Sequence, residues 1–181
     1  LEVNARIAEL SDPEEISFAA AEILARAMGV DRAGYGLIDP RRETITIERD
    51  WNAPGVQSLA GVLNFRDYGS YIEDLKRGET VVFADAREDP RTRDTAAALE
   101  AINARSIVNM PVTEEGSFVA LLYLNHGDRR EWTAEELSLI REVANITRSA
   151  VERRRAEQAL IAEKRALEIL NEAGAVVAAD M

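Results

Sequence analysis

Residues 106–125, SIVNMPVTEEGSFVALLYLN, carry the pattern that decides the fold of this 181-residue chain. Two apolar runs, residues 106–112 and 118–125, flank the tight turn Glu114-Glu115-Gly116 and predict a β-hairpin. The second run is apolar on both faces, so we expect it to lie in the middle of a covered sheet. Strict alternation sorts its side chains into Phe118, Ala120, Leu122 and Leu124 on one face and Val119, Leu121 and Tyr123 on the other.

A long helix is predicted to follow the hairpin. Thr133 and Glu136 have the spacing of a capping box. Trp132 and Leu137 occupy the two positions of a hydrophobic staple around the same helix start. Nothing in the sequence stops this helix until about Gly174, which gives a length of about 40 residues or about 60 Å. A compact domain does not need a helix of that length.

The second half of this helix, residues 152–172, is mostly charged. Its apolar residues form a thin line, which consists of Ala156, Leu160, Leu167 and Leu170. A helix of this composition is not stable alone in water, so we expect a partner helix to cover it. A frayed tail without a partner is the alternative.

The N-terminal half is predicted to contain a helix and a second hairpin. Asp12 and Pro13 begin a helix that Gly29 ends. A hairpin follows, in which Ile45, Ile47, Arg49 and Trp51 are expected on one face of the returning strand. The chain loses its regular period over residues 52–67. Three short elements are then expected, namely a helix over 68–76, a strand over 80–84 and a helix over 95–104.

The composition excludes several classes of function. With 33 acidic and 22 basic residues the formal net charge is −11, which repels phosphate backbones and anionic lipids, so we expect no nucleic-acid partner and no membrane contact. The absence of cysteine excludes disulfides, a thiolate nucleophile and a thioether-linked cofactor. No secretory signal and no apolar run of about 18 residues is present, so we expect a cytoplasmic location.

His126 is the only histidine of the chain and follows the apolar run. No nucleophile motif such as G-x-S-x-G accompanies it, so we predict that this chain is not an enzyme. A first-row metal site would have to consist mostly of carboxylates, and none is predicted. One histidine could ligate a heme. By alternation His126 shares a face with Leu122 and Leu124, and it is structural if that face is covered by helices.

The order of these elements resembles a GAF domain, the small-molecule sensing module of bacterial signalling proteins and phytochromes. The resemblance covers about residues 10–155 and is strongest over Arg105–Leu139. It implies an α+β fold with an antiparallel sheet of five to six strands, terminal helices on one face, and a ligand pocket on the other. It also implies a long C-terminal signalling helix that pairs in a parallel dimer. One departure is Ala120, where relatives often carry glycine.

The resemblance divides the chain into four segments. We expect the end of an N-terminal linker helix over residues 1–10, the GAF domain over 11–151, the coiled-coil signalling helix over 152–172, and the start of a following domain, such as a second GAF domain, over 173–181. The chain is therefore expected to be a segment of a longer protein, with a sensor histidine kinase of a two-component system as its output.

Six residues are candidates for the ligand pocket. They comprise aromatic residues around the irregular segment and two residues that fall near chromophore-contacting positions of phytochromes: Trp51, Phe65, Asp67, Tyr68, Tyr71 and His126. The phytochrome pattern is incomplete, because its proline after Asp67, its histidine within residues 96–98 and any cysteine are missing. The motif of cyclic-nucleotide GAF domains and the cysteines of methionine sulfoxide-reducing members are also missing.

Two functions remain open at this point. The first is a sensory domain that binds an unidentified small molecule and relays a signal through its exit helix. The second is a structural dimerisation and spacer module whose pocket is filled by its own side chains. Heme or bilin binding is less favoured, and no obligatory cofactor is predicted.

Overall fold

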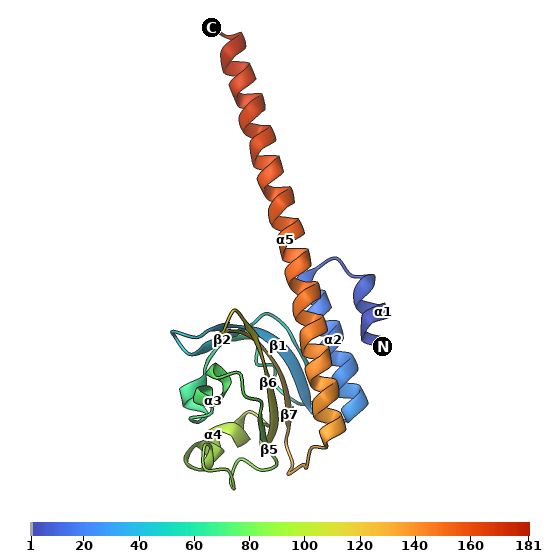
Figure 1. Cartoon of the computed structure of the whole chain (residues 1–181), viewed down its shortest axis with the longest axis vertical. Coiled ribbons are helices and arrows are strands. Elements are labelled where there is room, and N and C mark those ends of the chain that lie inside the picture. The colour runs from blue at the N-terminus through green and yellow to red at the C-terminus, as the bar shows by residue number, and fades with distance from the viewer. Residues whose placement is uncertain (1) are drawn as a thin grey trace.

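The computed structural model describes residues 2–181 as one antiparallel sheet with helices on both faces (Figure 1). The helices are α1 (Glu2–Ala8), α2 (Pro13–Met28), α3 (Ile72–Lys76), α4 (Ala96–Ala101) and α5 (Ala134–Ala179), with 3-10 turns η1 (Phe65–Asp67) and η2 (Arg93–Thr95). The strands are β1 (Arg32–Asp39), β2 (Thr44–Ile47), β3 (Asp50–Asn52), β4 (Gly61–Asn64), β5 (Val81–Phe83), β6 (Ser106–Glu114) and β7 (Ser117–His126).

The sheet has the strand order β4-β2-β1-β7-β6-β5, with β3 also paired to β1, and every pair is antiparallel. The predicted α+β architecture and the central position of β7 are confirmed. The sheet has seven strands instead of five to six. The difference arises because the returning strand of the first hairpin is divided into β2 and β3, and because β4 forms within the irregular segment.

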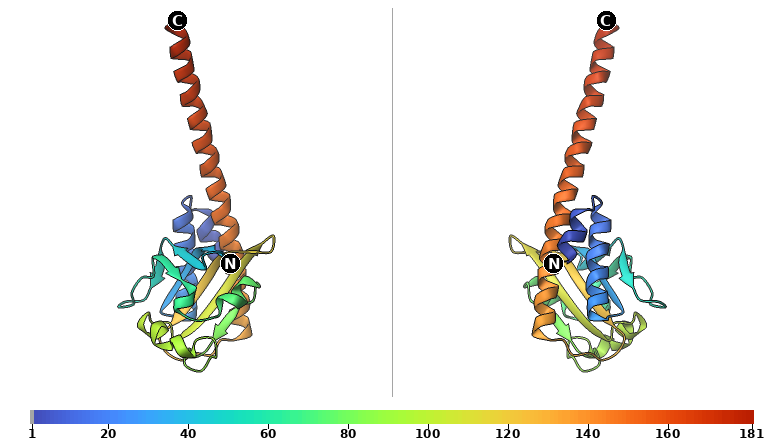
Figure 2. Two further views of the ribbon diagram at one scale, coloured as in Figure 1. Left: turned by 90° about the vertical axis from the view of Figure 1, so that its left-hand side faces the viewer. Right: turned by 90° about the vertical axis from the view of Figure 1, so that its right-hand side faces the viewer.

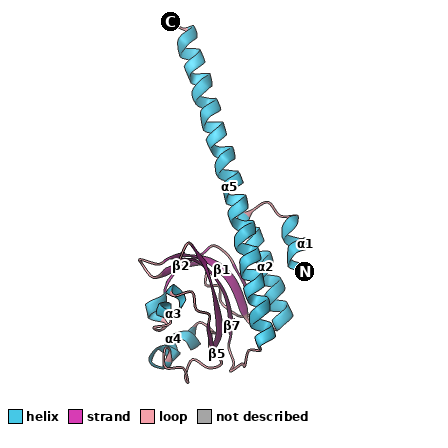
Figure 3. Cartoon of the chain, in the orientation of Figure 1, coloured by secondary structure: helices cyan, strands magenta, loops and turns pink. Residues whose placement is uncertain are grey.

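The α1, α2 and α5 helices cover one face of the sheet, which we call the helix face, whereas α3 and α4 lie over the opposite face (Figure 3). The Asp12 side chain accepts a hydrogen bond from the Glu14 N–H at 3.1 Å at the start of α2. Gly29 ends α2 at φ 65°, a left-handed conformation that glycine adopts without strain. The core of this face is a mainly aliphatic cluster that includes Leu24, Leu122 and Val143.

Two β-bulges shift side chains from the face that alternation predicts. Leu37 pairs with Thr46, and Gly34 pairs with Asp50. The chain advances three residues along β1 but four residues from β2 to β3, so the returning strand contains one extra residue. Trp51 therefore lies on the helix face, opposite to Ile45 and Ile47. The prediction that these residues share a face was wrong, because one extra residue in a strand inverts every side chain beyond it.

The second bulge lies in the hairpin of β6 and β7. Val112 pairs with Ala120 and Thr113 with Phe118, so one step on β6 matches two on β7. Phe118 consequently packs in the same cluster as Leu121 and Tyr123, and its predicted grouping with Leu122 was wrong.

The α5 helix extends far beyond the sheet (Figure 2). Its 46 residues correspond to about 70 Å. The capping box is present, since the Glu136 N–H donates to Thr133 Oγ1 at 3.1 Å and the Thr133 N–H donates to Glu136 Oε1 at 3.0 Å. The helix continues through Gly174, where the sequence predicted its end. Within residues 2–181 no helix is both long and apolar enough to cross a membrane.

Candidate functional site

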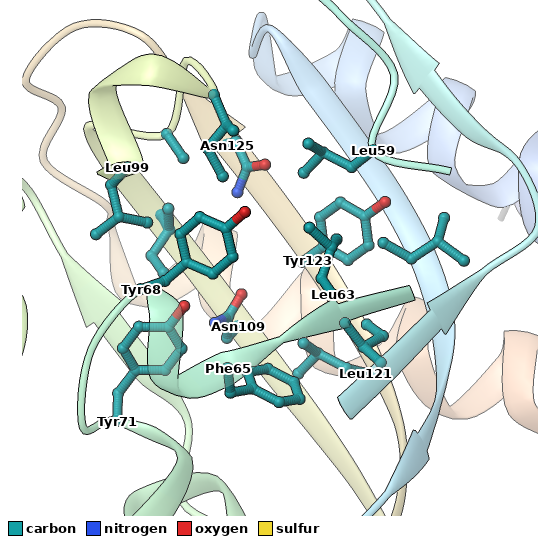
Figure 4. A pocket seen from close by; sticks show the side chains of 15 residues that line it. Leu59, Leu63, Phe65, Tyr68, Tyr71, Leu99, Asn109, Leu121, Tyr123 and Asn125 are labelled. Atoms are coloured by element: carbon teal, nitrogen blue, oxygen red, sulfur yellow. The ribbon is translucent and has the colours of Figure 1, made fainter. Parts of the chain in front are cut away.

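A cavity lies on the face of the sheet opposite to α2 and α5, and the irregular segment between β3 and β5 and the segment around α4 enclose it (Figure 4). The space open to groups of the size of water measures about 60 Å³, and it reaches about 460 Å³ only when the gaps between the lining atoms and the mouth to solvent are counted. Its lining consists of Ile45, Ile47, Leu59, Leu63, Phe65, Tyr68, Tyr71, Leu99, Ile102, Ala104, Ile107, Asn109, Leu121, Tyr123 and Asn125. This composition, mostly apolar with a few convergent polar groups, is typical of small-molecule sites.

Three of the six predicted pocket residues line this cavity. Phe65 belongs to η1, and Tyr68 and Tyr71 lie between η1 and α3. Phe65 and Tyr71 pack edge to face, with ring centroids 6.3 Å apart and planes at 90°. The irregular segment therefore supplies an aromatic wall, as its composition predicted.

The other three predicted pocket residues do not line the cavity. Trp51 lies on the helix face, with the guanidinium carbon of Arg26 5.3 Å from its ring centroid. Asp67 is exposed at the end of η1. His126 follows Leu122 and Leu124, which face the helices, and its Nδ1 lies 3.5 Å from Asp31 Oδ2 at the exit of β7. His126 therefore lies on the helix side of the sheet, outside the cavity lining.

The floor of the cavity depends on two glycines of β1. A Cβ atom added to Gly34 would lie 2.1 Å from the Tyr123 hydroxyl, and one added to Gly36 would lie 2.5 Å from Ile45 Cγ1. Tyr123 and Ile45 therefore lie flat across β1. Any residue other than glycine at positions 34 and 36 would place a Cβ atom in the space that these two side chains occupy. The alternation of glycine in the run Gly34-Tyr35-Gly36 is the reason that aromatic and aliphatic side chains of neighbouring strands form this floor.

A buried arginine holds the polar end of the cavity together. Arg32 on β1 is fully buried, and its guanidinium donates to the carbonyl oxygens of Gln57 at 2.6 Å and Ile102 at 2.6 Å. It also donates to Asn125 Oδ1 at 3.0 Å, and its Nε lies 3.8 Å from Asp50 Oδ2. Arg32 thus joins two segments that enclose the cavity to the central strands.

Two phenol groups of the lining keep their protons through the neutral pH range. Burial raises the pKa of Tyr123 well above its usual value. Burial also raises the pKa of Tyr71 far above its usual range, and a hydrogen bond with the Asn109 side chain lowers it in part. The lining of the cavity, as the structure describes it over residues 2–181, includes no Asp, Glu, Lys, Arg or His.

The sequence interpretation missed Asn109, Tyr123, Asn125 and Arg32. Asn109 interrupts the apolar run of β6, and Asn125 ends that of β7. A polar residue in an otherwise apolar strand, on the same face as a tyrosine, is the pattern that would have identified them. The role of Arg32 was not detectable, because its partners are 18 to 93 positions away in the chain.

Arg148 of α5 forms hydrogen bonds with two strands below the cavity. Arg148 Nε and Nη2 donate to the two carboxylate oxygens of Glu114, at the end of β6, at 2.6 and 3.0 Å. Arg148 Nη1 donates to the Tyr35 hydroxyl of β1 at 3.5 Å and to Glu152 at 2.9 Å. The Arg148 guanidinium lowers the pKa of Glu114 by hydrogen bonding. Arg148 therefore contacts both β1 and the end of β6 from α5.

Solved structures with the same fold share less than 20% of their residues with this chain. The blue-light-absorbing form of the PixJ GAF domain from Thermosynechococcus elongatus has a TM-score of 0.68 at 18% identity, over 83% of this chain and 91% of that chain. A phycoerythrobilin-bound GAF domain from a cyanobacterial phytochrome has a TM-score of 0.72 at 17% identity, over 87% and 94%. Residues 122 to 287 of a methyl-accepting chemotaxis protein give 0.70 at 19%, over 87% and 99%.

A family model matches this chain, whereas no curated protein sequence does. The family model described as GAF domain matches residues 12–151, which include the whole sheet, the cavity and the sheet-packed part of α5. The chain belongs to the GAF domain family.

Proposed function

We propose that this chain is a non-catalytic sensory domain that binds a small molecule in the cavity and relays its occupancy through α5 to an output domain. The carrying observation is that a cavity with convergent polar groups and α5 lie on opposite faces of the same strands, joined by Arg148. Occupancy or collapse of the cavity would shift the tilt or register of α5. The two states need differ by only a few kcal/mol.

The exposed half of α5 supports a proposal for how two chains assemble and which domain follows. Leu160 and Leu167 lie on one line of the helix and are 66% and 54% exposed in the single chain. Exposed leucines in a line are typical of a surface that a partner helix covers. A homodimer through the terminal helices would cover them in a parallel coiled coil. We propose a cytoplasmic sensor histidine kinase of a two-component system as the longer protein, in which α5 leads to the next domain.

Bilin binding is supported less well than binding of a smaller molecule. One structural neighbour is phycoerythrobilin-bound, but this chain has no cysteine for a thioether bond. Bilin propionates are anionic, and the cavity lining described above supplies no cation for them. The second candidate function, a structural dimerisation and spacer module, would use the same sheet and helices with no ligand.

Purification of the chain from cells, followed by an absorbance spectrum and native mass spectrometry, separates these functions. A retained small mass that dissociates on unfolding is the expected result. A visible absorbance band would favour heme or bilin instead. Absence of both, together with an unchanged melting temperature across a metabolite panel, would favour the structural module and contradict the sensory proposal.

A further inference from the structure

The polar atoms of the cavity have defined orientations. Asn125 Oδ1 accepts a hydrogen bond from Arg32 Nη1 at 3.0 Å. A guanidinium has only donors, so the atom that faces it must be the amide oxygen. The Nδ2 group of Asn125 is therefore turned away from Arg32, towards the centre of the cavity beside Tyr68 (Figure 4). Asn125 offers a fixed hydrogen-bond donor to a ligand.

Tyr123 supplies a second donor. Its hydroxyl is buried and has no hydrogen-bond partner within residues 2–181. Its raised pKa keeps the proton on the oxygen. A buried donor without an acceptor is costly, by about 1–3 kcal/mol. Tyr123 belongs to the lining, but its hydroxyl is fully buried and lies over Gly34 of β1. Its ring therefore has to shift for the hydroxyl to meet an acceptor of a ligand, which would remove that cost.

The charge of the cavity restricts the ligand further. The lining described within residues 2–181 contains no ionisable carboxylate, ammonium, guanidinium or imidazole. The nearest guanidinium, Arg32, is already occupied by carbonyl oxygens, Asn125 and Asp50. The lining itself offers no counter-charge to an ion, which would also lose its hydration, and this is strongly unfavourable.

The shape and composition of the walls favour a flat molecule. Rings of Phe65, Tyr68, Tyr71 and Tyr123 line the cavity, with aliphatic side chains between them. Aromatic rings interact favourably with another ring in offset-stacked or edge-to-face geometry. The walls are therefore suited to an aromatic ring, and the two fixed donors to an acceptor at its edge.

We infer that the cavity takes a small, uncharged aromatic or heteroaromatic molecule that carries a hydrogen-bond acceptor, such as a carbonyl oxygen or a ring nitrogen, at its edge. This inference rests on the proposed ligand-binding function and names the chemical class of its ligand. The acceptor would bond to the Tyr123 hydroxyl or to the Asn125 amide, and the ring would lie against Tyr68 and Phe65.

Three probes of equal heavy-atom count test the inference, namely acetophenone, benzoate and cumene. Acetophenone has the acceptor and no charge, benzoate has acceptors and a charge, and cumene has neither. Titration at pH 7.5, followed by the ¹⁵N NMR signals of the Asn109 and Asn125 side-chain amides, gives the dissociation constants. Acetophenone is expected to bind at least about tenfold more tightly than benzoate.

A matched pair of variants tests the role of the donor. In Tyr123→Phe the preference for acetophenone over cumene is expected to fall at least about fivefold, because the hydrogen bond is lost while the apolar contacts remain. Tyr35→Phe, on the helix face of the same sheet, should leave the preference unchanged. The ratio of the acetophenone and cumene affinities is compared between the variants and the unchanged chain. The difference in hydrophobicity between the two probes is the same in each and cancels.

The comparison of acetophenone with benzoate requires no variant, so it remains decisive even where a substitution impairs folding. Benzoate binding as tightly as acetophenone, an unchanged ratio in Tyr123→Phe, or no binding of any probe would overturn the inference. Native mass spectrometry of the purified chain judges the proposed function separately. A retained charged molecule would support ligand binding and contradict the neutral aromatic class.

Discussion

The two faces of the sheet differ in what covers them. On the helix face, Leu122 and Leu124 of β7 pack against α2 and α5 in a mainly aliphatic cluster. On the cavity face, the alternate residues Leu121 and Tyr123 of the same strand border a space that is partly open to solvent, and the Tyr123 hydroxyl lacks a partner. A single strand thus packs against the helices with one set of residues and borders the cavity with the other.

Arg32→Met is expected to have a large effect, because it breaks the buried polar network at the polar end of the cavity. The substitution leaves the buried Asp50 without its cation, and the Gln57 and Ile102 carbonyls lose their donor. We expect a loss of about 3–5 kcal/mol in the free energy of unfolding, measured by urea denaturation.

Arg41→Met at the exposed tip of the first hairpin is the matched control for Arg32→Met and should change this free energy by less than about 0.5 kcal/mol. Equal effects of the two substitutions would show that Arg32 does not hold the enclosing segments.

Adjacent leucines of β7 compare the packing of the two faces directly. Leu122→Ala leaves a void in the helix face and is expected to cost about 3–5 kcal/mol. Leu121→Ala enlarges a space that already exists and should cost less, by at least about 1 kcal/mol. Urea denaturation of both variants gives the difference. A larger cost for Leu121→Ala would mean that the cavity face is the more tightly packed of the two.

Gly34→Ala tests whether the cavity floor needs a residue without a side chain. The new methyl group would overlap the Tyr123 ring, which has to swing into the cavity, at a cost of about 1–3 kcal/mol. We expect weaker acetophenone binding as well as lower stability.

Gly174→Ala on α5 meets no atom within 4 Å and is the control for Gly34→Ala. It should raise helix stability by about 0.5–1 kcal/mol. Unchanged stability and binding in Gly34→Ala would refute the close contact between Tyr123 and β1.

Leu160→Gln combined with Leu167→Gln should have the smallest effect on the domain itself. Both side chains are exposed in the single chain, so its free energy of unfolding measured at low concentration should change by less than about 0.5 kcal/mol. Dimerisation, measured by light scattering, is expected to weaken strongly. A chain truncated after Glu152 that stays fully dimeric would contradict the assignment of the interface to this part of α5.

The local patterns of the sequence predicted the elements better than the faces of the strands. The capping box at Thr133 and the tight turn at Glu115 depend only on neighbouring residues, and both are present. The faces of Trp51 and Phe118 were predicted wrongly, because each lies beyond a bulge that no local pattern marks. The aromatic wall was predicted from composition, since the irregular segment gathers Phe65, Tyr68 and Tyr71.

The polar end of the cavity could not be predicted, because it depends on contacts between distant segments. Asn125 acquires a defined orientation only through Arg32, which is 93 positions away in the chain. Asp67 and His126 were selected by their resemblance to chromophore-contacting positions, and both lie outside the lining. The resemblance to the GAF family predicted the fold, whereas the chemistry of the cavity depends on tertiary contacts that no local pattern shows.

The central claim is that occupancy of the cavity face changes the position of α5 on the helix face. The cysteine-free chain permits spin labels at Val62→Cys on β4 and Arg165→Cys on α5, both at exposed positions. Double electron–electron resonance, with the labelled chain diluted in unlabelled chain, measures the distance between them within one molecule. Saturating acetophenone is predicted to shift this distance distribution, while benzoate leaves it unchanged. Identical distributions with and without bound acetophenone would contradict the account.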